Sequence, residues 1–263
     1  MKVSITTATL NSRKTIKDCL QSVNNQTYPE IEHIIQDGGS TDGTREIVNQ
    51  NSGKNIRMYS EPDLGIYDAL NKGISHSTGD IIGFLHSDDV FSSPFILEHI
   101  MKLFIKNNLD VVYGDLVYVN QGSRNKTIRY WKSKSFSAGL IKRGWMPPHP
   151  TVFMKKSVYL QYGLYNSKYK ISADYELILR TFLNPKLKIG YIPEVVTRMT
   201  IGGKSNKSIK NIITKSSEDY GILKDKRIPF PALVLLLKNL NYLSLLKKSV
   251  YIAATSTILS IYD

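Results

Sequence analysis

Two adjacent carboxylates, Asp88 and Asp89, follow the apolar run Ile81 to Leu85 after only two further residues, His86 and Ser87. Removing carboxylates from water is costly unless they meet a cation, so a pair at the end of a buried strand is a candidate metal site. Mg²⁺ and Mn²⁺ prefer carboxylate oxygens and usually keep phosphate oxygens as co-ligands. Because an Asp-Asp pair is also common in turns, the pair alone leaves a simple turn open.

A second acidic segment, Asp37-Gly38-Gly39-Ser40-Thr41-Asp42-Gly43, follows an apolar run at Ile31 to Ile35. Asp37 is placed to accept hydrogen bonds from a ribose or a base, and the glycines let the backbone approach a ligand closely. The alternative is a plain glycine-rich turn with Asp42 near the N-cap of the next helix. The segment has neither the P-loop pattern nor the dinucleotide-binding glycine pattern.

Strand and helix signals alternate through the first 110 residues, with helices expected over Ser12 to Asn25, Ile66 to Ser77 and Phe95 to Phe104. This alternation predicts a parallel sheet covered by helices on both faces. Ligands bind such sheets beyond the carboxyl ends of the strands. Three polar loops lie at these ends and are expected to converge there: Ala8 to Asn11, Gln36 to Asp42 and His86 to Asp89. From Val111 to about Ile201 the pattern changes, with strands expected at Val111 to Val119, Thr151 to Met154 and Lys188 to Ile192, and helices at Tyr159 to Tyr162 and Ala173 to Phe182.

Together with the segment Ser60 to Gly73, these motifs resemble the family 2 glycosyltransferases, from Val3 to about Ser205. The resemblance implies an α/β GT-A fold, Rossmann-like, with a mostly parallel central sheet and flanking helices. It also implies a catalytic domain at residues 1–207, divided into a nucleotide-sugar half (1–110) and an acceptor half (111–207). In this family the acidic pair corresponds to the DxD-type element, but here its usual first Asp is missing, since His86 and Ser87 precede the pair.

The same resemblance implies the roles of individual residues. The nucleotide is expected to contact Thr7, Asn11, Asp37, Asp68 and Asp88, with Asp88 near the ribose and diphosphate. The metal, Mn²⁺ or Mg²⁺, is expected on Asp89 and His149. For His149, which lies among prolines, contact with the diphosphate or the acceptor and a purely structural role stay open. Residues Gly202 to Ser205 resemble a flexible lid.

Asp174 is expected to be the catalytic base. The segment Ser172-Ala173-Asp174-Tyr175-Glu176 resembles the family segment that carries the base, with Ala173 in place of the more usual Glu. Inversion needs one carboxylate to take the proton of the acceptor hydroxyl while the oxygen attacks the anomeric carbon. The alternative for Asp174 is a helix N-cap, and Glu176 and Arg180 are expected to pair on the helix surface.

The formal net charge of +13 favours an anionic partner, but lysines and arginines are scattered, which predicts no nucleic-acid binding. The tail, residues 208–263, is expected to be helical and basic, with Leu-rich stretches, and to lie on an anionic membrane surface. The alternative is a hairpin packed on the main domain or on a partner subunit. No uninterrupted apolar run reaches the roughly 18 residues of a membrane span. The single cysteine, Cys19, is expected to be buried and fits a reducing cytoplasm.

These expectations combine into one hypothesis: an inverting hexosyltransferase that moves a sugar from a UDP-sugar to a saccharide acceptor. The tail and the resemblance suggest that the acceptor is linked to undecaprenyl diphosphate in bacterial surface-polysaccharide synthesis. The enzyme would then be cytoplasmic and peripheral on the inner face of the plasma membrane. The alternative is a nucleotidyltransferase acting on sugar phosphates.

Overall fold

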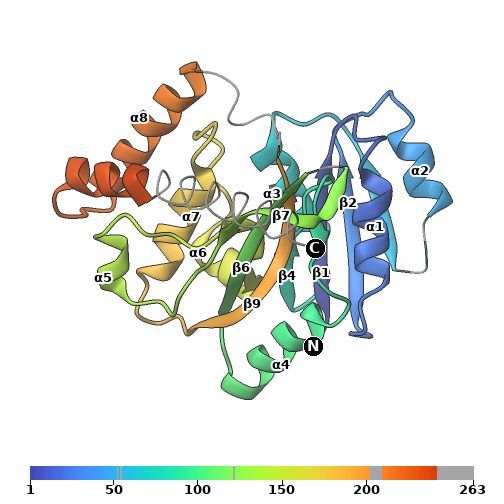
Figure 1. The fold of residues 1–263 in the computed structure, drawn as a ribbon, viewed down its shortest axis with the longest axis horizontal. Coiled ribbons are helices and arrows are strands. Elements are labelled where there is room, and N and C mark those ends of the chain that lie inside the picture. Colours follow the sequence, from blue (N-terminus) through green and yellow to red (C-terminus); the bar gives the residue numbers. More distant parts are fainter. Residues whose placement is uncertain (52, 54, 121, 202–208, 242–263) are drawn as a thin grey trace, which may run out of the picture.

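The computed structural model describes all residues except 52, 54, 121, 202–208 and 242–263. Its strands are β1 (Val3–Thr9), β2 (Ile31–Asp37), β3 (Ile56–Ser60), β4 (Ile81–Phe84), β5 (Val90–Phe91), β6 (Val111–Asn120), β7 (Ser123–Trp131), β8 (Phe153–Lys155) and β9 (Ile189–Thr200). They form one nine-stranded sheet in the order β3-β2-β1-β4-β8-β6-β9-β5, with β7 paired to β6 (Figure 1).

Eight α-helices and one short 3₁₀ helix have both ends in the described part of the chain: α1 (Ile16–Asn24), α2 (Thr44–Gln50), α3 (Ile66–His76), α4 (Ile96–Asn107), α5 (Ala138–Ile141), η1 (His149–Thr151), α6 (Lys156–Tyr162), α7 (Ala173–Phe182) and α8 (Ile209–Asp225). Residues 231–241 are helical as well. The helices expected over Ser12 to Asn25, Ile66 to Ser77, Phe95 to Phe104 and Ala173 to Phe182 are confirmed to within a few residues.

The expectation of a mostly parallel sheet is correct for the first half and wrong for the second. β1 is parallel to β2 and β4, and β2 is parallel to β3. β8 is antiparallel to both β4 and β6, and β7 and β5 are antiparallel to β6 and β9, while β6 and β9 are parallel. Only two residues separate β6 from β7, and so short a connection permits only antiparallel pairing. The sheet is therefore mixed.

Helices cover both faces of this sheet. On one face, α1 and α4 pack against β1, β4, β6 and β8. On the other face, α3, α6 and α7 do so together with α8. Neighbouring residues of β4 illustrate the alternation, because Ile81 belongs to the first cluster and Ile82 to the second. Cys19 of α1 is fully buried in the first cluster, as expected.

The start of the expected tail packs on the domain. Ile222, Leu223, Ile228 and Val234 are buried in the same cluster as α3 and α7. Figure 1 shows α8 on the side of the molecule away from α1 and α2. Over residues 209–241 the alternative of a packed hairpin is therefore supported, and the remainder of the expected helical tail, residues 242–263, lies outside the described residues. No helix among the described residues is long and apolar enough to cross a membrane.

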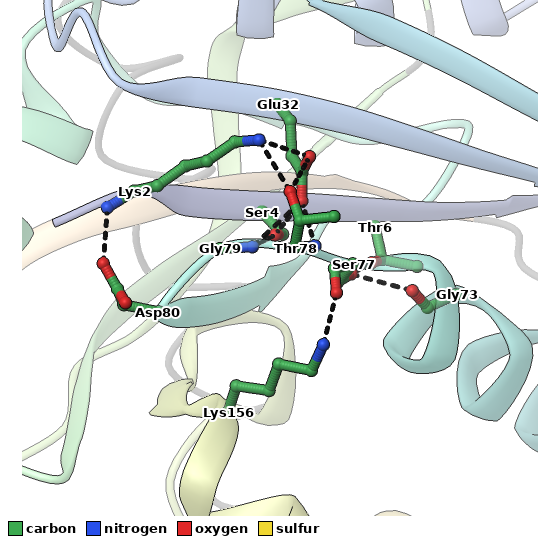
Figure 2. Close-up of polar contacts among 10 residues, drawn as sticks. All are labelled: Lys2, Ser4, Thr6, Glu32, Gly73, Ser77, Thr78, Gly79, Asp80 and Lys156. Carbon is green, nitrogen blue, oxygen red and sulfur yellow. Dashed lines mark hydrogen bonds and ion pairs between the residues drawn. The ribbon is translucent and has the colours of Figure 1, made fainter.

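A buried carboxylate ties the amino ends of the strands together (Figure 2). Glu32 of β2 is 3% exposed, and its Oε2 lies 2.7 Å from Lys2 Nζ. Its Oε1 accepts hydrogen bonds from the Ser4 hydroxyl and from the backbone N–H groups of Thr78 and Gly79. This network joins β1, β2 and the turn before β4 at the end of the sheet opposite the polar loops.

Replacing Glu32 by Ala is expected to lower the free energy of unfolding by about 3 kcal/mol, because donors buried around the carboxylate lose their acceptor. Burial raises the pKa of Glu32, but the hydrogen bonds from Lys2, Ser4 and Thr78 together outweigh this effect and lower the pKa to about 2. The charged form therefore stabilises the fold above the unfolded pKa near 4.5, and this stabilisation is lost as the pH falls towards 2.

Denaturant unfolding of the wild type and of Glu32→Gln at several pH values tests this pH dependence of stability. The stability difference between the two proteins should be constant above about pH 5 and should shrink at lower pH. The matched control is Glu30→Gln, which changes an exposed carboxyl two residues away. A difference that does not vary with pH would contradict the assignment.

Candidate active site

The three polar loops meet at the carboxyl edge of the parallel strands, as expected. The backbone N–H of Asn11 donates to Ser40 Oγ at 2.8 Å, and that of Ser12 donates to Thr44 Oγ1 at 2.8 Å. The hydroxyls of Ser12 and Ser87 are 2.8 Å apart. The loops after β1, β2 and β4 are thus joined directly to one another.

Asp37 shapes the turn after β2. It is fully buried, and its carboxylate accepts hydrogen bonds from the backbone N–H groups of Gly39 and Ser40 and from the hydroxyls of Ser40 and Ser60. A Cβ at Gly38 would lie 2.3 Å from Asp63 Oδ2, so a larger residue there would displace the Asp63 carboxylate. The contact of Asp37 with a nucleotide stays a prediction.

Asp42 lies next to the N-cap of α2, as the alternative of a glycine-rich turn expected. Its Oδ1 accepts hydrogen bonds from the backbone N–H and the hydroxyl of Thr44, the first residue of α2, and its Oδ2 accepts the backbone N–H of Arg13. These contacts lower the pKa of Asp42, the largest effect coming from the Thr44 hydroxyl. The N-cap of α2 is Gly43, and Asp42, one residue earlier, bonds the first residue of the helix and links its loop to the loop after β1.

The other residues expected at the nucleotide lie in three different settings. Asn11 has a left-handed backbone (φ 54°), and its Oδ1 accepts the backbone N–H of Thr41. Thr7 is fully buried with its hydroxyl 2.9 Å from His33 Nε2, and its contact with a nucleotide stays a prediction. Asp68, in the first turn of α3, accepts the backbone N–H of Leu64, and this contact lowers the pKa of Asp68.

Asp174 lies at the start of α7 in contact with two side chains from other elements. Its Oδ2 is 3.1 Å from His149 Nδ1, and its Oδ1 accepts hydrogen bonds from Tyr67 Oη at 3.2 Å and from the backbone N–H of Tyr175 at 2.8 Å. The N-cap of α7 is Ser172, so the N-cap alternative for Asp174 is wrong. The side chain is 18% exposed and belongs to the first turn of α7.

A pair of histidines connects Asp174 with the acidic pair. The ring centroids of His86 and His149 are 6.1 Å apart in an edge-to-face arrangement. Burial, and to a smaller extent His149, lower the pKa of His86 to about 4, although the charges of Asp88 and Asp174 oppose this shift. His86 is therefore neutral at neutral pH. The charges of Asp88 and Asp174, the two carboxylates on which the expected chemistry depends, both affect the pKa of His86.

Asp88 and Asp89 have different surroundings. Asp88 is partly exposed, and no donor among the described residues bonds to its carboxylate, while its backbone carbonyl accepts the Thr200 hydroxyl. Asp89 is 1% exposed, and its Oδ1 accepts the backbone N–H of Thr200 at 2.9 Å. Both residues thus attach the loop after β4 to the end of β9, and Asp88 is the more exposed of the two.

The expected metal was tested against these side chains. No group of three or more His, Cys, Asp or Glu side chains within the described ranges is placed to hold an ion. His149, expected on the metal, is paired with Asp174. A Mg²⁺ or Mn²⁺ ion that is shared with a diphosphate needs only one or two protein carboxylates, and Asp88 fits that requirement.

Two further expectations have clear outcomes. Glu176 and Arg180 do pair, at 3.0 Å, but Glu176 is 6% exposed and also bonds Lys226, so the expected surface location is wrong. The lid expected at Gly202 to Ser205 lies outside the described residues.

Tyr67 was not singled out from the sequence, although it lies in the segment that carries Asp68, because nothing in the spacing shows that α3 faces α7.

Comparisons with known proteins agree with this architecture. Residues 4–162 match the family model described as Glycosyl transferase family 2. A relative from Mycobacterium bovis (strain BCG / Pasteur 1173P2), described as a PGL/p-HBAD biosynthesis glycosyltransferase, is 32% identical over 208 residues, covering 77% of this chain and 78% of the relative.

Two solved structures share the fold at low sequence identity. S. aureus TarS 1-349 in complex with UDP-GlcNAc has a TM-score of 0.66 and 19% identity, covering 86% of this chain and 65% of that one. The mannosyltransferase PcManGT from Pyrobaculum calidifontis, in complex with GDP-Man and Mn²⁺, has a TM-score of 0.63 and 14% identity, covering 100% and 81%. At these identities the likeness shows the fold alone.

Proposed function

Because the chain belongs to glycosyl transferase family 2, and is therefore a glycosyltransferase with the GT-A fold, we propose that it is an inverting enzyme that transfers a hexosyl residue from a UDP-sugar to a saccharide acceptor. The observation that carries the proposal is the position of Asp174. This carboxylate is held by His149 and Tyr67 at the edge where the loops after β1, β2 and β4 meet. Its charge and that of Asp88 both raise the pKa of the neighbouring His86.

Asp174 supplies the base in this reaction. The acceptor hydroxyl oxygen forms a bond to the anomeric carbon while the bond from that carbon to the diphosphate oxygen breaks, and UDP leaves with the electron pair. The hydroxyl proton passes to Asp174. Its Oδ2 has a single partner among the described residues, His149, and so keeps a lone pair for this proton. Tyr67 and the Tyr175 N–H fix the other oxygen.

The donor's diphosphate is proposed to lie beside Asp88. A Mn²⁺ or Mg²⁺ ion, when bound, would stabilise the negative charge that develops on the leaving diphosphate. Asp88 rather than Asp89 is the proposed protein ligand, because its carboxylate is partly exposed and has no donor from the described residues. Support for a metal and for a UDP-sugar comes from the relatives of the same fold that were solved with Mn²⁺ and with UDP-GlcNAc.

A donor screen that measures UDP release tests the function. Purified protein is incubated with UDP-glucose, UDP-galactose and their N-acetylated forms, with Mn²⁺, Mg²⁺ or EDTA, and with a saccharide acceptor. The proposal expects UDP to be released in an acceptor-dependent and metal-dependent manner. Release of pyrophosphate from a nucleoside triphosphate and a sugar phosphate would instead identify a nucleotidyltransferase.

The acceptor is proposed to be lipid-linked and presented at a membrane surface. Helical residues 231–241 bury Val234 and Lys238 against the domain, and their opposite face exposes apolar side chains: Phe230 just before the helix, then Leu233, Leu236 and Leu240, each more than half exposed. An apolar face on a basic protein is typical of binding to anionic lipid. The acceptor is proposed to be an undecaprenyl-diphosphate-linked saccharide, with the enzyme peripheral on the cytoplasmic side of the plasma membrane.

Replacing Leu233, Leu236 and Leu240 by Gln together is expected to reduce binding to vesicles of phosphatidylglycerol and phosphatidylethanolamine by at least about tenfold, because three side chains lose their apolar contact. Vesicle co-sedimentation at low and high salt measures this. Leu160→Gln is the matched control, since Leu160 is 73% exposed on α6. Equal sedimentation of the triple variant and the wild type would contradict membrane contact by this face.

A further inference from the structure

Three consecutive backbone N–H groups before α7 converge on one side chain from α8. Glu218 Oε1 accepts the N–H of Lys170 at 2.8 Å, and its Oε2 accepts those of Ile171 at 3.0 Å and Ser172 at 2.9 Å. Hydrogen bonds to a carboxylate are roughly twice as strong as those between neutral groups. One side chain therefore fixes the backbone of three residues in succession.

The segment that Glu218 holds leads directly to the proposed base. Ser172 is the N-cap of α7 and makes no side-chain capping bond, and Asp174 follows two residues later. The Ile171 carbonyl accepts a hydrogen bond from Tyr67 Oη, which also lies 3.2 Å from Asp174 Oδ1. A shift of residues 170–172 would thus move Asp174 and displace Tyr67 at the same time.

The part of α8 that carries Glu218 is itself anchored. Asp219 is 1% exposed and lies 2.7 Å from Lys238 Nζ and 3.4 Å from Lys215 Nζ. Lys238 Nζ is also 3.2 Å from the ring centroid of Tyr175, the residue after Asp174. Breaking such a buried pair is strongly destabilising, so α8 and residues 231–241 form a firm support behind the start of α7.

We propose that Glu218 is a positioning residue for the base: it holds the segment Lys170 to Ser172 so that Asp174 and Tyr67 meet in the geometry needed for proton transfer. This inference rests on the proposed function of Asp174. The negative charge of Glu218 also lies near the positive end of α7, where it is favourable. Among the described residues, the hydrogen bonds of Glu218 go to Lys170, Ile171 and Ser172 and to none of the side chains assigned to the donor.

Glu218→Ala is expected to lower kcat by about a hundredfold, because a displacement near 1 Å at a reacting group has an effect of this size. The donor KM should stay unchanged. Glu218→Gln, which keeps an acceptor oxygen but loses the charge, should recover part of kcat. The amides of Lys170, Ile171 and Ser172 should exchange hydrogen faster in Glu218→Ala, a readout independent of activity. Asp225→Ala is the control, since Asp225 is also on α8 and its polar side-chain contacts within the described part of the chain are with the side chains of Lys168 and Tyr169.

The outcomes separate this inference from the proposed function. Loss of transfer in Asp174→Asn together with wild-type kcat in Glu218→Ala overturns the positioning role and leaves the function standing. Full transfer by Asp174→Asn overturns the function and the inference together. Should Glu218→Ala not fold, Glu218→Gln decides: a lower kcat at unchanged donor KM and melting temperature supports positioning, whereas a parallel fall in donor affinity and melting temperature shows a merely structural role.

Discussion

Asp174→Asn is expected to reduce the turnover of sugar transfer by about 10²–10⁴-fold, the usual effect of removing a general base. The amide keeps the shape of the side chain and an oxygen for the Tyr175 N–H, but it cannot take a proton at neutral pH. Donor binding should be unaffected, because the loops expected to hold the nucleotide lie on other elements. Steady-state UDP release with saturating acceptor gives kcat, and calorimetric titration with UDP gives the donor affinity.

Glu194→Gln is a suitable control for this variant. Glu194 lies on β9 and pairs with His99 of α4, so its change to an amide tests for effects of charge alone. Near-wild-type turnover of Asp174→Asn would show that another group takes the proton. His149 would then be the first residue to examine, because it is the side chain 3.1 Å from the same carboxylate.

The second large effect is expected at Asp88. Asp88→Asn should lower transfer at least about a hundredfold, because a metal contact at the leaving group supplies several kcal/mol and each 1.4 kcal/mol corresponds to about a factor of ten. Its melting temperature should match that of the wild type, since no described donor depends on this carboxylate. UDP release at increasing Mn²⁺ concentrations measures both the loss and any change in metal requirement.

Asp89 provides the contrast. Asp89→Ala leaves the backbone N–H of Thr200 without its acceptor, which should lower stability by about 1–3 kcal/mol. Asp89→Asn retains an acceptor oxygen and should fold normally. If Asp89→Asn loses all transfer while Asp88→Asn stays active, the metal is on Asp89, as the sequence resemblance implies, and the assignment to Asp88 is wrong.

The sequence was most informative where a local pattern determines the structure. The apolar run of β4 and the helical spacing of α1 and α3 follow from periodicity, so their positions and the convergence of the three loops were predicted. β7 was missed, because its composition, Ser123-Arg124-Asn125-Lys126-Thr127, is polar and lacks alternation. β5 has two residues and produces no pattern at all.

The site divides in the same way. Asp174 and the acidic pair were located from motifs, but the partners of Asp174 were not, because Tyr67 and His149 are distant in the chain and meet only through packing of α3, η1 and α7. The different burial of Asp88 and Asp89 depends on where β9 ends, which no spacing reveals. Contacts of this kind are set by tertiary structure, and a single sequence does not encode them in a local pattern.

The position of the Glu32 network has a consequence for how this enzyme can change. The network lies at the amino ends of the strands, while Asp88, Asp174 and the loops that join them lie at the carboxyl ends. Substitutions in the loops that alter sugar or acceptor preference are therefore separated from the Glu32 network by the length of the strands. A library that randomises the loops and preserves Glu32, Lys2 and Ser4 should yield a high fraction of folded variants. Most substitutions lower stability, and the intact Glu32 network helps the variants to stay above the stability needed to fold. The sheet thus allows specificity to evolve at one end while the other preserves the fold.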